Sequence, residues 1–106
     1  MIRSMSIEDA IQRISEMPDD AVLAAKQPWT WGSPAIFAGL DESFRLPAVA
    51  SAEGYQILLD KEDLLELLEA ASKKKMGPRS VAELVIHYTI YDCGPSWYSD
   101  LPNADV

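Results

Sequence analysis

Apolar and polar positions follow helical spacing at the start of the chain. Between residues 7 and 17, apolar side chains recur every three or four positions, as on one face of a helix. Ser6 and Asp9 stand three residues apart and resemble a capping box, with an acid in the first turn. This pattern predicts a helix over residues 7–17, which ends at the turn-forming Pro18.

Three short apolar runs follow, and their length is typical of buried strands. They cover residues 21–25, 35–40 and 55–59, and each is bounded by turn-forming or polar residues. Residues 44–52 contain a proline, which predicts an edge strand or an ordered loop there. Short links between successive strands favour an antiparallel meander.

A second helix is predicted directly after the last of these runs. Asp60 is a suitable N-cap, and Asp63 follows three residues later. One apolar stripe then recurs at helical spacing, formed by Leu64, Leu67, Leu68 and Ala71 and widened by Leu65. The glutamates fall on the opposite face.

A third helix is predicted over the segment Val81–Asp92. Ser80 and Glu83 form a second capping-box pattern, although the β-branched content of the segment also suits a strand. As a helix, the segment carries a second apolar stripe of Ile86, Ile90 and Cys93. A helix that is apolar on two sides is either central in the fold or covered by another element.

These elements predict a single α+β domain over residues 1–106. A small antiparallel sheet of three to four strands is expected with three helices, and the strands lie between helix one and helices two and three in sequence. We expect the helices to cover one face of the sheet. The ordered core is expected over about residues 5–98, with a C-terminal tail over residues 99–106.

Composition adds one strong feature, which is acidity. Seventeen acidic residues stand against nine basic ones, so the net charge is −8 on 106 residues. Such a chain is repelled by nucleic-acid phosphates and anionic membranes, whereas a protein partner with a basic surface attracts it. No apolar run approaches the roughly 20 residues that span a bilayer. A single cysteine and no secretory signal pattern favour the cytoplasm.

Scattered positions between Met17 and Trp97 carry a resemblance. The matching stretches are Pro18-Asp19-Asp20-Ala21, Trp29 to Ser33-Pro34, Asp41-Glu42, Gly54-Tyr55, Glu62-Asp63-Leu64 and Tyr88-Thr89-Ile90-Tyr91-Asp92. On these residues the chain resembles a family of short bacterial and phage-associated proteins, catalogued only as a domain of unknown function. The resemblance implies an α+β fold and supplies no activity and no site residues.

Candidate chemistry is sparse. His87 is the only histidine, and on a helix it is poorly placed to pair with Cys93. Adjacent acids, as in the Asp41-Glu42 pair, point apart and suit turns and caps better than acid–base catalysis. The sequence therefore predicts no enzyme, no cofactor and no metal, and it leaves open a metal site that joins Asp41 and Glu42 to distant acids.

The sequence favours a non-enzymatic protein-interaction module. In its sharper form this is a small inhibitor, of the kind that phages use against host defence or bacteria use against toxins, which occludes a basic, nucleic-acid-binding surface of its partner. Salt-sensitive contacts are expected from carboxylates and apolar anchoring from aromatic rings. The expected partner-binding residues are Asp41, Glu42, Glu62, Glu66, Glu69, Trp29, Trp31, Trp97 and Tyr98. The alternative is a structural or assembly protein that forms a homodimer through helix three.

Overall fold

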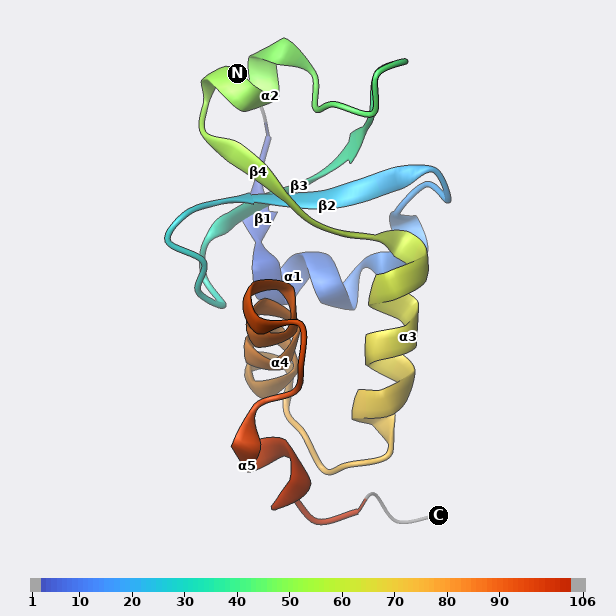
Figure 1. The fold of residues 1–106 in the computed structure, drawn as a ribbon, viewed down its shortest axis with the longest axis vertical. Coiled ribbons are helices and arrows are strands. Elements are labelled where there is room, and N and C mark those ends of the chain that lie inside the picture. The colour runs from blue at the N-terminus through green and yellow to red at the C-terminus, as the bar shows by residue number, and fades with distance from the viewer. Residues whose placement is uncertain (1–2, 104–106) are drawn as a thin grey trace.

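A four-stranded antiparallel sheet separates two unequal helical layers (Figure 1). The computed structural model describes residues 3–103. The strands are β1 (Met5–Ser6), β2 (Ala21–Lys26), β3 (Pro34–Gly39) and β4 (Tyr55–Asp60). The predicted α+β class with a small antiparallel sheet is confirmed.

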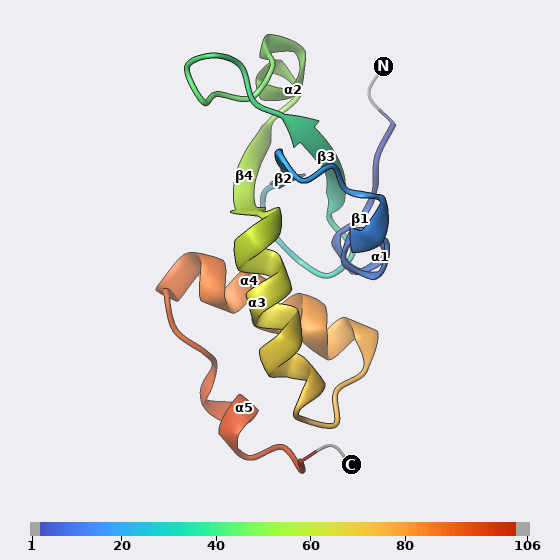
Figure 2. The same cartoon turned by 90° about the vertical axis from the view of Figure 1, so that its right-hand side faces the viewer.

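The helices occupy both sides of this sheet. They are α1 (Ile7–Gln12) with the 3₁₀ turn η1 (Ile14–Glu16), α2 (Ala48–Ala52), α3 (Lys61–Ser72), α4 (Pro78–Tyr91) and α5 (Ser96–Ser99). Figure 1 shows α1, α3 and α4 on one side of the sheet and α2 on the other. In Figure 2, α3 crosses in front of α4, and α5 lies beyond them at the far end from the sheet.

The strand order is β1-β3-β2-β4, so the predicted meander is wrong. β2 and β3 form a hairpin as expected, but β4 pairs with β2 rather than with β3. The connection over residues 40–54 is long enough to pass over the sheet, and it carries α2 on its way. As a result β2 is a central strand.

Two hydrophobic cores lie on the two faces of the sheet. Leu23 of β2 points into the larger core, together with Leu64 of α3 and Val85 of α4. Val22 and Ala24 point to the smaller core beneath α2. Burial on both faces explains why β2 reads as an unbroken apolar run rather than as an alternating one.

Two local predictions about this architecture hold only in part. Residues 44–52 form a loop followed by α2, so of the two predicted alternatives the edge strand is wrong, and Leu46 and Ala50 turn inward to cover the second face of the sheet. Val81–Asp92 is helical, as favoured, but Ser80 does not cap it. α4 begins at Pro78, which suits a first helical position because it has no N–H to leave unpaired.

Several hydrogen bonds attach the chain after α4 to α3 and to the residues that follow it. The Tyr98 hydroxyl donates to the Ala70 carbonyl of α3 at 2.7 Å. The backbone N–H of Lys75 donates to Pro102 at 2.9 Å, and Lys74 forms an isolated bridge with Asn103. Residues 104–106 of the expected tail lie outside the described residues.

Candidate functional site

Three adjoining hollows around α3 are lined by acidic side chains. The first, of about 470 Å³, lies between α3 and the end of α4, and the second, of about 330 Å³, lies on the outer side of α3. The third, of about 230 Å³, lies at the start of β2. Glu66 lines both of the first two hollows, and Glu62 lines both of the last two, so neighbouring hollows share a lining side chain.

Nearly half of the chain's acids gather there. Eight of the 17 acidic residues line these hollows, and we call them the acidic surface: Asp19, Asp20, Asp60, Glu62, Asp63, Glu66, Glu69 and Asp92. Among the residues that line the three hollows, Lys61 is the single basic one. This asymmetry makes the potential negative around the three hollows.

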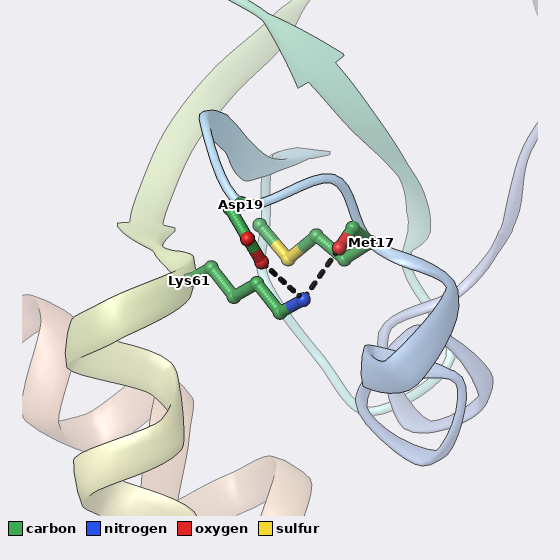
Figure 3. A network of polar contacts seen from close by, with 3 residues as sticks. All are labelled: Met17, Asp19 and Lys61. Atoms are coloured by element: carbon green, nitrogen blue, oxygen red, sulfur yellow. Dashed lines mark hydrogen bonds and ion pairs between the residues drawn. The ribbon is translucent and has the colours of Figure 1, made fainter.

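Lys61 is already engaged inside the protein (Figure 3). Its ammonium group donates to the Met17 carbonyl at 2.7 Å and to the Asp19 carboxylate at 3.0 Å. These two contacts tie the start of α3 to the turn before β2. The remaining carboxylates of the acidic surface are therefore not neutralised by this lysine.

The register of α3 places its glutamates outward. Asp60 caps the helix by accepting the Asp63 N–H at 2.8 Å, and the buried Leu64 fixes which face points to the core. Leu65 is 47% exposed and lies among the glutamates of the second hollow, so it does not widen the core stripe as predicted.

Like charges face each other along this helix. Glu62 and Glu66 are four residues apart, and Glu66 and Glu69 are three apart, so each pair shares one face of α3. Within the described residues, none of the three forms an ion pair. Each such pair lowers the stability of the helix by roughly 0.2–0.5 kcal/mol. The stability of the fold therefore does not explain why these glutamates are placed together.

Asp41 and Glu42 lie outside the three hollows. One carboxylate oxygen of Asp41 accepts the backbone N–H groups of Ser43 and Arg45, at 2.8 and 2.9 Å. Asp41 therefore organises its own loop, while Glu42 is exposed beside it. Their predicted part in binding a partner stays a prediction.

A separate groove collects all three tryptophans. Trp29 and Trp31, from the loop between β2 and β3, meet Trp97 of α5 across the outer side of α4, where they line a groove of about 440 Å³. The segment that carries Trp29 and Trp31 forms bends and a turn rather than a strand, and both residues line one groove. We call this the tryptophan groove; Thr30, Glu83, Ile86, His87, Ile90 and Tyr91 complete its lining.

The other residues singled out in the sequence take structural positions. Tyr98 faces α3, with its ring under the Lys74 ammonium at 5.7 Å, and lies outside the tryptophan groove. His87 donates from Nδ1 to the Cys93 carbonyl at 2.9 Å, because a carbonyl can only accept. Within residues 3–103, no group of three His, Cys, Asp or Glu side chains is placed to hold a metal ion.

Phe44 is the exposed residue that sequence reasoning missed. Its side chain is 81% exposed, and its backbone has a φ of 61°, in the left-handed region. The Asp41 carboxylate holds the turn that presents it. The only signal in the sequence was an aromatic residue within a polar loop, which does not reveal a backbone angle.

Comparison with known proteins adds no relative: no family model, curated protein or solved structure matches this chain. The resemblance to a family of unknown function stays a prediction. No helix in the described part of the chain is long and apolar enough to cross a bilayer.

Proposed function

We propose that this protein is a non-enzymatic interaction module that docks its acidic surface on a basic protein partner. The observation that carries the proposal is the gathering of eight acids around three neighbouring hollows, with Lys61 as the single basic residue in their lining. Carboxylates on a folded surface form charge-assisted hydrogen bonds with arginine and lysine side chains. The hollows give such side chains room beside each carboxylate.

The rigid attachment of α3 supports the same proposal. The Asp60 cap, the contacts of Lys61 and the buried Leu64 hold the helix in one register before any partner arrives. A preorganised surface loses little conformational freedom on binding, so more of the charge attraction appears as affinity. Long-range attraction also raises the association rate.

The consequence for the partner is occlusion. A basic surface that holds nucleic acid presents lysines and arginines at the spacing of phosphates, and a carboxylate surface competes for the same side chains. We therefore propose a small inhibitor, of the anti-defence or immunity-protein kind, which blocks nucleic-acid binding by its target. The protein itself is repelled by nucleic acid because of its net charge of −8.

The test is affinity capture from a bacterial lysate with the immobilised protein across a salt series. Captured proteins are identified by mass spectrometry, and the nucleic-acid affinity of each is then measured with and without this protein. We expect partners that leave as salt rises, since the Debye length falls from about 10 Å at 0.1 M to about 3 Å at 1 M. We also expect their nucleic-acid affinity to fall when the protein is present.

Two charge-matched variants locate the contact. Glu62→Gln with Glu66→Gln removes two charges from the acidic surface, whereas Glu16→Gln with Glu53→Gln removes two exposed charges outside the three hollows. The first variant should lose the partner at lower salt, and the second should behave as the wild type. Equal losses in both variants, or capture that is indifferent to salt, contradict the proposal.

A homodimer through α4 is the second candidate. Ile90 and Tyr91 are 53% and 64% exposed, which leaves apolar surface on the outer side of this helix. The stripe is narrower than predicted because Ile86 is only 8% exposed and packs into the core. Light scattering across a concentration series tests it: a mass that stays at one chain excludes the dimer.

A further inference from the structure

We propose that the tryptophan groove is a second binding site, which takes the side chain of an arginine from a partner protein. The groove lies on the other side of α4 from the hollow between α3 and α4, and no residue lines both. This inference therefore does not depend on the acidic surface.

The groove is held in shape before any ligand binds. The hydroxyl of the buried Ser33 accepts the Thr30 N–H at 2.8 Å and donates to the Pro28 carbonyl at 2.7 Å, which closes the loop that carries two of the tryptophans. The indole N–H of Trp29 donates to the Ala25 carbonyl of β2 at 3.1 Å. A groove fixed in this way loses little freedom when it is filled.

Its loop is also anchored to the first helix. The backbone N–H groups of Ile7 and Glu8, at the start of α1, donate to the carbonyls of Ser33 and Trp31, both at 3.0 Å. On the opposite wall the His87 and Tyr91 rings lie 4.6 Å apart, centroid to centroid. Both walls of the groove therefore belong to well-packed elements.

The chemistry of the lining selects a cation. Indole and phenol rings attract cations to their faces, and tryptophan does so most strongly. The lining holds one carboxylate, Glu83, and neither lysine nor arginine. Glu83 is an exposed residue, and its carboxylate can form a charge-assisted hydrogen bond with a guanidinium that lies in the groove, which a purely apolar occupant cannot do.

The protein already contains one example of this contact. The guanidinium carbon of Arg79 lies 3.6 Å from the centre of the Trp31 ring, and its Nε lies 3.8 Å from a Glu8 carboxylate oxygen. One indole face with a nearby carboxylate is thus the arrangement that this surface uses for its own arginine. A planar guanidinium stacks on a flat ring better than an ammonium group does, so we assign arginine rather than lysine.

The experiment titrates the protein with a blocked glycine–arginine–glycine peptide, followed by NMR of the three indole N–H signals and by tryptophan fluorescence. The matched probe replaces arginine with citrulline, which keeps the planar shape and removes the charge. We expect the arginine peptide to shift the indole signals in a saturable way, and the citrulline peptide to bind at least about fivefold more weakly. Equal binding of the two peptides overturns the proposal.

Two single-charge variants locate the site. Glu83→Gln lies in the groove, and Glu66→Gln lies on the acidic surface, so both change the net charge equally. Glu83→Gln should weaken binding of the arginine peptide by about three- to tenfold, and Glu66→Gln by less than twofold. If Glu66→Gln weakens binding as much as Glu83→Gln, the peptide binds the acidic surface and the groove proposal is wrong, while the proposed function stands.

A third outcome concerns the second copy of the chain. If the indole signals shift on concentrating the protein without peptide, and light scattering reports a doubled mass, the groove is filled by another copy. That result also overturns the arginine assignment. Trp31→Leu provides the final check, because it removes the most exposed indole. It should weaken binding of the arginine peptide without changing the melting temperature of the protein by more than a few degrees.

Discussion

Two adjacent leucines of α3 give the sharpest test of how this surface is built. Leu64 is fully buried in the larger core, and Leu65 is 47% exposed among the glutamates. Truncation of each to alanine makes the same chemical change one residue apart. Helix propensity changes equally at the two sites, so the difference between the variants reports burial alone.

The magnitudes follow from the two environments. Leu64→Ala removes a fully packed side chain and leaves a cavity, which costs about 2–5 kcal/mol. A domain of this size unfolds with about 5–15 kcal/mol, so the change consumes a large part of its stability. Leu65→Ala removes a side chain that is half in water and should cost about 0.5–1 kcal/mol.

Urea denaturation followed by circular dichroism measures both. With a slope of about 1.5 kcal/mol per molar urea, Leu64→Ala should lower the midpoint by about 1.3–3.3 M, and Leu65→Ala by about 0.3–0.7 M. Midpoints that fall equally would refute the register of α3. The glutamates would then point elsewhere, and the acidic surface as described would not exist.

Three further changes have defined outcomes. Asp60→Ala removes the side-chain oxygen that accepts the Asp63 N–H and should destabilise the protein by about 1 kcal/mol in urea, whereas Asp60→Ser, which keeps the cap, should cost less than half of that. Phe44→Gly relieves a left-handed backbone at an exposed side chain and should raise the free energy of unfolding by about 0.5–1 kcal/mol, seen as a higher melting temperature; a lower melting temperature contradicts the strained φ. Glu66→Gln removes the charge that repels Glu62 and Glu69 on α3, so it should stabilise the free protein by a few tenths of a kcal/mol at low salt. This gain should disappear in 1 M salt.

Local chemistry made part of this fold predictable from sequence. Asp60 and the stripe that begins at Leu64 specify α3 without help from the rest of the chain, because a cap and a helical period are short-range signals. The central strand β2 was recognisable because burial on both faces leaves an unbroken apolar run. The start of α4 was predicted too late, because Ser80 resembles a cap, whereas the first helical position is Pro78, a residue suited to that position.

The positions of α2, β4 and β1 in the fold could not be predicted from such local signals. α2 has five residues, too few to show a helical period, and its inward residues are set by the second face of the sheet. The position of β4 beside β2 depends on the path of residues 40–54 over the sheet, which no local signal records. β1 has two residues and no pattern of its own.

The residues of the candidate sites also fall into those that local sequence patterns predicted and those that only tertiary packing brings together. The outward face of α3, with Glu62, Glu66 and Glu69, followed from helical spacing. Its continuation to Asp19 and Asp92 required tertiary packing, as did the meeting of Trp97 with two tryptophans more than sixty residues earlier in the chain. Asp41 shows the opposite case, since a carboxylate that looked available is used to hold its own loop.

The most direct test of the central claim is the association rate constant with the captured partner as a function of ionic strength. A negative surface that steers a basic partner predicts a rate that falls by about tenfold or more between roughly 50 and 500 mM salt, and a lower, flatter dependence for the variant with Glu62→Gln and Glu66→Gln. An association rate that is the same at every salt concentration, and the same for that variant, would contradict the claim.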